Sequence, residues 1–265
     1  MTGRLTPNRI WQLSFGLSPR DLSVVATLSK VRVMTSRQLE RLHFPGQART
    51  ARRTLEELVK RRVLARLGRR VGGVRAGSAG HVYALDVVGQ HLRGNGGPAR
   101  GQRLRRPWTP GERFLDHVLA VSEVYVQLVE MEREGEFEIL DFEAEPECWR
   151  EFSVMGAPVI LKPDAYVRLG FKKHEDSYFV EVDRATESVA TLRVKAEVFE
   201  RYYQSGEEQH RRGVFPKVLW IAPDEGRASE LRGAVSSVGQ EADLHAVITA
   251  AAVPRWLAEP QPIAS

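Results

Sequence analysis

The 265-residue sequence contains a single cysteine, Cys148, and no long apolar run. One cysteine excludes an internal disulfide and is typical of proteins in a reducing compartment. No histidines and cysteines have the spacing of a zinc site, and the first residues lack the apolar region of a signal peptide. The longest apolar stretch, 246–253, is far shorter than a membrane-spanning helix. We therefore expect a cytoplasmic protein with no membrane partner.

Acidic residues are scarce in the first part of the chain. Residues 1–110 contain 22 lysines and arginines but only 5 aspartates and glutamates, a net charge of +17. Residues 111–265 contain 17 basic and 29 acidic residues, a net charge of −12, which leaves +5 for the whole chain. Nearly all basic residues of the first part are arginines, whose guanidinium groups bind phosphates and guanine edges. This asymmetry predicts two units with different partners, of which the first binds nucleic acid.

Three helices followed by a glycine-rich pair of strands are expected in the first part. Ser18 fits a helix cap, Pro19 the first helical position, and Asp21 the acid of a capping box. The expected helices cover about 18–31, 35–42 and 47–61, and the expected strands cover 63–67 and 81–85, around a glycine-rich tip. This order is typical of a winged helix-turn-helix domain, which we place at residues 1–92.

In a winged helix, the third helix enters the major groove of double-stranded DNA and the wing contacts the backbone. The residues expected to contact DNA are basic side chains of the third helix (Arg49, Arg52, Arg53 and Lys60) and of the wing (Arg69, Arg70 and Arg75). The alternative for any single one of them is a solvated side chain without a ligand. The fold is compatible with a homodimer on palindromic DNA, although no segment of the sequence demonstrates one.

A linker rich in glycine, proline and arginine, residues 93–111, separates this domain from the second, which we place at residues 112–265. A long helix is expected at 112–134, then strands at 137–142, 149–154, 159–169 and 178–183, and a helix at 187–203. The near-continuous apolar run 218–222 is typical of a buried parallel strand. A helix at 223–238 and a strand at 244–250 complete the expected domain.

Carboxylates interrupt two of these apolar strands. Because strand side chains alternate, common sides are expected for Lys162, Asp164, Tyr166 and Arg168 in the first strand, and for Phe179, Glu181 and Asp183 in the second. A carboxylate within an apolar strand is costly unless something compensates its charge. The pattern therefore indicates either a site for Mg²⁺ or Mn²⁺ or a buried network of ion pairs with Arg168 and Arg184.

Residues 112–222 resemble the restriction-endonuclease-like, or PD-(D/E)xK, nuclease superfamily. The resemblance lies in the order of helix, three strands, helix and strand, and in the sequences Pro163-Asp164 and Glu181-Val182-Asp183. It implies an α+β or α/β domain with a mixed sheet, in which Asp164 and Glu181 bind magnesium. It also implies that an acidic residue of the first helix assists them, and Glu123 matches that position.

The superfamily also has a lysine two positions after the glutamate, where it helps to position the attacking water. This chain has Asp183 at that place. The alternative lysines are Lys162, in the strand of Asp164, and Lys195, on the following helix. The resemblance therefore leaves two interpretations open: an active metal-dependent DNA endonuclease or nickase, and a nuclease-like scaffold that binds DNA or docks partners.

The whole chain is also similar to the replication-relaxation family of actinobacterial and phage or plasmid mobile elements. The similarity covers about residues 18–225 and includes HVLAVSEVYVQL from His117, KPDA from Lys162 and EVDRATES from Glu181. It implies a nucleoid-associated DNA-binding protein that acts in the replication, maintenance or transfer of such an element, with that element's replication or transfer proteins as partners. A winged-helix transcriptional regulator is a further alternative.

Overall fold

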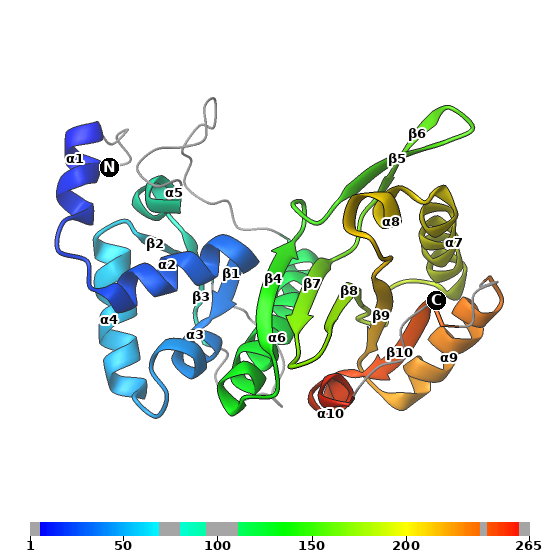
Figure 1. Cartoon of the computed structure of the whole chain (residues 1–265). Helices are drawn as coiled ribbons and strands as arrows, with labels where there is room; N and C mark the ends of the chain where they lie inside the picture. The colour runs from blue at the N-terminus through cyan, green and yellow to red at the C-terminus, as the bar shows by residue number, and fades with distance from the viewer. Residues whose placement is uncertain (1–5, 69–79, 94–110, 239–242, 260–265) are drawn as a thin grey trace. The chain divides into compact units, whose positions relative to one another are not determined.

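The computed structural model describes residues 6–68, 80–93, 111–238 and 243–259. It is a mixed α and β structure that divides into two compact units, Met1–Val126 and Gln127–Ser265 (Figure 1). The division falls inside the long helix α6 (Glu112–Glu134), whose bounds agree with the expected helix. Among the helices in the described ranges, none is long and apolar enough to cross a membrane.

The N-terminal unit consists of short helices around a small sheet. Its helices are α1 (Pro7–Ser14), α2 (Pro19–Val31), α3 (Ser36–His43), α4 (Ala48–Lys60) and α5 (Val87–Arg93), and its strands are β1 (Val33–Thr35), β2 (Leu64–Leu67) and β3 (Val82–Leu85). The strands form an antiparallel sheet in the order β1-β3-β2. The three expected helices and the two expected strands are thus confirmed, whereas α1, α5 and β1 were not predicted.

Two capping boxes begin α2 and α3. At α2, the hydroxyl of Ser18 accepts a hydrogen bond from the amide of Asp21 at 3.2 Å, and the carboxylate of Asp21 accepts one from the amide of Ser18 at 2.8 Å. Thr35 and Gln38 make the same reciprocal contacts at α3. Each box satisfies two backbone amides that a helix start otherwise leaves without partners. The expected box at Ser18 is confirmed.

The first half of α6 completes the core of the N-terminal unit. Its apolar side chains pack on the small sheet in a buried cluster formed by Val33, Leu67, Val82, Ala84, Leu115, Val118 and Leu119. The hydroxyl of Ser122 donates a hydrogen bond to the carbonyl oxygen of Val33 at 2.7 Å. Without this part of α6, one face of the sheet would expose its apolar side chains to water, which explains why the division falls within the helix.

A five-stranded mixed sheet is the framework of the C-terminal unit. Its strands are β4 (Glu138–Ala144), β7 (Ala165–Gly170), β8 (Glu175–Val182), β9 (Lys217–Ala222) and β10 (His245–Thr249), in the order β10-β9-β8-β7-β4. The pairs β4/β7 and β7/β8 are antiparallel, and the pairs β8/β9 and β9/β10 are parallel. The prediction of a buried parallel strand at 218–222 is therefore confirmed.

Helices cover both faces of this sheet. They are α7 (Val189–Ser205), α8 (Glu207–Arg212), α9 (Glu225–Ser236) and α10 (Val253–Ala258), the last preceded by the 3₁₀ turn η1 (Ala250–Ala252). On one face, Phe179 of β8 packs against Phe199 of α7 in a core that α9 also enters. The neighbouring Tyr178 points to the opposite face, where its ring lies 5.7 Å from that of Trp256 in α10. Period-two alternation thus places successive residues of β8 in different layers.

The expected strand at 159–169 is wrong, because the chain bends at 162–164. The residues before the bend form β6 (Ala157–Leu161), which pairs with β5 (Arg150–Val154) in a separate two-stranded sheet, and those after it form β7. Pro163 has no amide proton to donate to a ladder, so a strand does not continue easily through it. The predicted common side of Lys162 and Asp164 is therefore also wrong.

Candidate functional site

Asp164 and Glu181 lie side by side in the C-terminal unit. Asp164 is the residue before β7, and Glu181 is near the end of the neighbouring strand β8. The carboxylate of Asp164 accepts a hydrogen bond from the amide of Val182 at 2.7 Å, and its own amide donates to the carbonyl oxygen of Val180 at 3.0 Å. Both carboxylates are buried, with 7% and 3% of their residue surfaces exposed. The backbone contacts of the bend thus hold two carboxylates together away from water.

Burial raises the pKa of Glu181 well above its usual range, and the charge of Asp164 raises it further. The ammonium group of Lys195 lies 3.3 Å from Glu181 and 3.0 Å from Glu187, and it opposes this increase. Burial alone would lower the pKa of Lys195, but the surrounding carboxylates raise it, so the amine stays protonated. Asp164, Glu181, Glu187 and Lys195 form what we call the carboxylate cluster, in which one positive charge faces three carboxylates.

Helix α7 brings Lys195 to this cluster. The hydroxyl of Ser188 accepts a hydrogen bond from the amide of Thr191 at 3.2 Å and caps the helix. Leu192, Ala196 and Phe199 form the buried side of α7, and the packing of that side places the Lys195 side chain beside Glu181 of β8. Of the two candidate lysines, Lys195 therefore joins the carboxylates, whereas Lys162 lies over the ring of Trp149 at 4.7 Å.

Asp183 has a different partner. Its carboxylate pairs with the guanidinium group of Arg227 in α9 at 2.5 Å, and both side chains are largely buried, with 2% and 10% exposed. Arg227 also donates to the carbonyl oxygen of Glu187 at 2.7 Å. This buried pair links the end of β8 to α9 and leaves Asp183 outside the carboxylate cluster. The network expected with Arg168 does not form, because Arg168 pairs with Glu175 at 3.9 Å.

Glu123 lies in the N-terminal unit and is held there by two residues of α3. Gln38 donates to its carboxylate at 2.9 Å, and Arg41 forms an ion pair with it. Within the described ranges, no group of three or more histidine, cysteine, aspartate or glutamate side chains is arranged to hold a metal ion. A divalent cation at Asp164 and Glu181 would consequently have two protein ligands and complete its coordination with water, as Mg²⁺ often does.

The basic residues predicted on the third helix project into solvent. Arg49, Arg52, Arg53 and Lys60 of α4 are exposed, whereas Ala51, Leu55 and Leu58 face the core. Arg53 also lines a groove of about 750 Å³ beside the start of α2, together with Arg20 and Arg61. Arg69, Arg70 and Arg75, predicted to contact DNA from the wing, lie outside the described residues.

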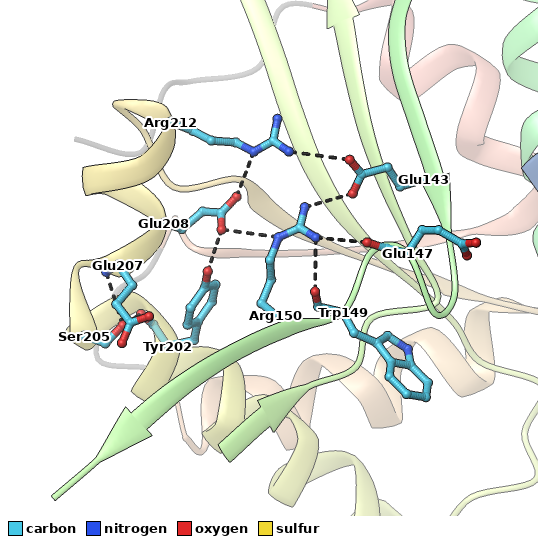
Figure 2. A network of polar contacts seen from close by, with 9 residues as sticks. All are labelled: Glu143, Glu147, Trp149, Arg150, Tyr202, Ser205, Glu207, Glu208 and Arg212. Carbon is cyan, nitrogen blue, oxygen red and sulfur yellow. Dashed lines mark hydrogen bonds and ion pairs between the residues drawn. The ribbon is translucent and has the colours of Figure 1, made fainter. Parts of the chain in front are cut away.

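A second polar cluster surrounds Arg150 at the start of β5 (Figure 2). Its guanidinium group is 3.1 Å from Glu143 of β4 and 3.4 Å from Glu208 of α8. Arg212 of α8 contacts the same two glutamates at 3.6 and 3.2 Å, and the hydroxyl of Tyr202 donates to Glu208 at 2.5 Å. Each charged side chain has a partner of opposite sign, and these ion pairs of the Arg150 cluster link β4, β5 and α8.

Comparison with known proteins gives one family match. The model of the family described as Replication-relaxation matches residues 25–218. No curated protein matches the chain. Among solved structures, protein VC1899 from Vibrio cholerae is similar with 11% identity and a TM-score of 0.32, over 94% of this chain and 53% of that chain. Restriction endonuclease FokI bound to DNA is similar with 11% identity and a TM-score of 0.28, over 95% of this chain and 44% of that chain. The chain thus spans about half the length of these proteins.

Proposed function

The chain belongs to the replication-relaxation family, and from this premise we propose that it is a double-stranded DNA-binding protein acting in the replication, maintenance or transfer of a mobile element. The N-terminal unit is the DNA-binding part, a winged helix in which α4 enters the major groove. The observation that carries this proposal is the row of exposed basic side chains on α4, in a part of the chain with a net charge of +17.

The arrangement of the N-terminal unit supports this assignment. The order of α2, β1, α3, α4, β2 and β3, with β3 between β1 and β2 in an antiparallel sheet, agrees with a winged helix. Helix α4 turns its apolar side to the core and its arginines to solvent. Arg53 and Arg20 also line the groove beside the start of α2, and guanidinium groups are well suited to bind phosphate. Helix and groove together offer contacts to bases and to phosphates.

Replacing Arg49, Arg52 and Arg53 together by alanine tests the proposal. Each phosphate contact contributes about 0.9 to the slope of log K against log salt, so the triple variant should lower that slope by about 2 to 3 and weaken binding. Fluorescence anisotropy of a labelled duplex at several KCl concentrations measures both quantities. Circular dichroism checks that the triple variant is folded. We expect it to be folded, because these three side chains are exposed and do not pack in the core.

The matched control removes the same charge from the C-terminal unit. Arg193, Arg201 and Arg255 are exposed there, and their triple alanine variant has the same net charge as the α4 variant. We expect it to keep the slope of the wild type. Equal slopes for all three proteins, or an equal decrease in both variants, would contradict binding through α4.

The carboxylate cluster favours a second function, a metal-dependent DNA endonuclease or nickase with a restriction-endonuclease-like C-terminal unit. The order α6, β4, β7, β8, α7 and β9 agrees with that superfamily, with the β5–β6 hairpin inserted between the first two strands. Asp164 and Glu181 would hold Mg²⁺ or Mn²⁺, which would stabilise charge at the reacting phosphate. Lys195 would position a water or the phosphate. The excess of carboxylates over lysine at this place fits a cation.

Titration of the protein with Mn²⁺ by calorimetry, together with cleavage assays on supercoiled, linear and branched DNA, tests this function. Asp164→Ala and Glu181→Gln should abolish metal binding and cleavage. Lys195→Met should keep the metal but reduce cleavage. Glu197→Gln, on the same helix but away from the cluster, is the control. No heat of metal binding and no cleavage by the wild type would reject the enzyme and leave the DNA-binding function standing.

A further inference from the structure

A pocket of about 430 Å³ lies beside the small sheet of the N-terminal unit. Residues of α2, of all three strands, of α5 and of the start of α6 line it. Its apolar lining extends the buried cluster in which α6 packs on the sheet, and includes Val33, Leu67, Ala84, Leu115 and Val118. Sites for small molecules have volumes of about 300 to 1,000 Å³ and combine such a lining with a few polar groups. The size and the lining of the pocket therefore fit a small organic ligand.

A small side chain in the middle of the sheet contributes to this space. Ala84 belongs to the central strand β3, where it pairs with Val33 of β1 on one side and with Ala65 of β2 on the other. Ala84 lines the pocket, although strand interiors more often contain β-branched or aromatic residues. A side chain of that size at this place would extend into the pocket. The space thus depends on an alanine, and substitution at Ala84 offers a way to fill it.

The polar part of the lining is basic. It consists of Arg32, which follows α2, and of Gln90 and Arg93 in α5, and none of the described residues that line the pocket is acidic. The guanidinium group of Arg32 lies over the ring of Phe114, 5.6 Å from its centroid, and Phe114 is 42% exposed. A guanidinium group has five N–H donors, so one that contacts other groups can still bind a carboxylate. Two guanidinium groups beside an apolar lining favour an anion.

The backbone at Arg32 is also unusual. This residue ends α2 with a φ angle of 69°, and its amide donates to the carbonyl oxygen of Leu28 at 3.0 Å. Positive φ angles at the end of a helix are typical of glycine and asparagine, and they are uncommon for other residues. Residues in such conformations cluster at functional sites. An arginine at a position that favours glycine is consistent with a role for its side chain at the pocket.

We propose that this pocket binds a small amphipathic anion, an apolar molecule with one carboxylate. The apolar part would pack between the sheet and α6, where burial removes it from water. The carboxylate would bind the guanidinium groups of Arg32 and Arg93, whose planar arrangement of donors matches its two oxygens. None of the lining residues belongs to α4, so the inference goes beyond the proposed function and does not rest on it.

Fluorescence of anilinonaphthalene sulfonate, an apolar anion that becomes bright when it leaves water, measures binding to the full chain. The wild type should show saturable binding, and decanoate should displace the probe. Decanol has the same apolar chain without the negative charge. It should displace the probe about tenfold less effectively, in line with the loss of a charge-assisted hydrogen bond.

Substitutions separate the guanidinium groups from the apolar space. Arg32→Gln combined with Arg93→Gln should weaken the binding of decanoate about tenfold and leave that of decanol unchanged. The matched control, Arg37→Gln combined with Arg52→Gln, removes the same charge at exposed positions outside the pocket and should bind as the wild type does. Ala84→Leu places a larger side chain in the pocket and should abolish the binding of both ligands. Circular dichroism checks that each variant is folded.

Several outcomes would overturn the proposal. The wild type would then show no saturable binding, decanoate and decanol would displace the probe equally, or the control variant would weaken binding as much as the variant at Arg32 and Arg93. A folded Ala84→Leu variant that still binds decanoate would place the ligand elsewhere, and if this variant does not fold, the variant at Arg32 and Arg93 decides. If the wild type binds no decanoate and Ala84→Leu abolishes a self-association seen by sedimentation velocity, a second copy of the chain occupies the pocket. None of these results depends on whether the wild type binds duplex DNA, so the proposed function is tested separately.

Discussion

Lowering the pH from 8 to 5 should remove about 2 kcal/mol of the free energy of unfolding through one buried side chain, His245. His245 begins β10, and its side chain is 4% exposed. The indole N–H of Trp220 donates to its Nδ1 at 3.2 Å, and its Nε2 lies 3.2 Å from the carboxylate of Glu200. Because an indole nitrogen only donates, Nδ1 must lack a proton, so the neutral ring carries its proton on Nε2. A second proton, on Nδ1, would point at the indole N–H of Trp220 and break this hydrogen bond.

The size of the effect follows from the difference between the pKa of His245 in the folded chain and its pKa in the unfolded chain. Burial lowers the pKa of His245 to about 4, against 6.5 for an exposed histidine. As the pH falls through 6.5, His245 becomes protonated in the unfolded chain but stays neutral in the folded chain. The stability contributed by the neutral ring is therefore present above pH 6.5 and is lost as the pH falls toward 4. The full separation corresponds to about 3 kcal/mol, of which about 2 kcal/mol is lost by pH 5.

Urea unfolding at several pH values between 8 and 5 measures this loss. The wild type should lose about 2 kcal/mol more over this range than His245→Gln, which has no titrating ring. Carboxylates titrate in both proteins and cancel in the difference. Trp220→Phe removes the opposing N–H and should show a weaker dependence than the wild type. Parallel curves for the wild type and His245→Gln would refute the reasoning, as would an Nδ1 proton seen by nitrogen NMR at pH 8.

Two further predictions concern buried groups of the C-terminal unit. Arg227→Met leaves the buried carboxylate of Asp183 without its ion pair and should lower the free energy of unfolding by about 3 to 5 kcal/mol; Arg232→Met, which breaks an exposed pair with Glu225, should cost less than about 1 kcal/mol in the same urea titration. Burial raises the pKa of the Cys148 thiol, so maleimide should label the native protein far more slowly than the urea-unfolded chain; equal rates would place the thiol at the surface.

Helix starts were predictable because their signals are local. The side chains of Ser18 and Asp21 bond to backbone amides within three residues of each other, so the sequence alone contains both partners. The inward face of the same helix does not follow from such local signals. Leu22 and Val24 are both apolar, yet Leu22 is 46% exposed and Val24 is fully buried. Periodicity indicates that a face exists, and the neighbouring elements decide which residues it contains.

The carboxylates of the candidate site could be predicted from the sequence, but the basic side chains that pair with them could not. Asp164 and Glu181 stood out because charged residues are costly in apolar strands. Whether Lys162 or Lys195 would join them depended on a bend at Pro163 and on the packing of α7. Arg227, the partner of Asp183, is 44 residues away in the chain, and no spacing pattern connects the two. Contacts between distant segments form only when the sheet and its helices assemble.

Because Lys195 belongs to a helix, the packing of that helix determines where its amine lies. An amine carried by β8 would be located by the strand ladder, whose hydrogen bonds tolerate many side-chain changes. This amine is located instead by the apolar residues on the buried side of α7, so substitution of a core residue of that helix such as Phe199 would displace it. Phe199→Leu should therefore alter the distance between ammonium and carboxylate while every polar residue of the cluster is unchanged.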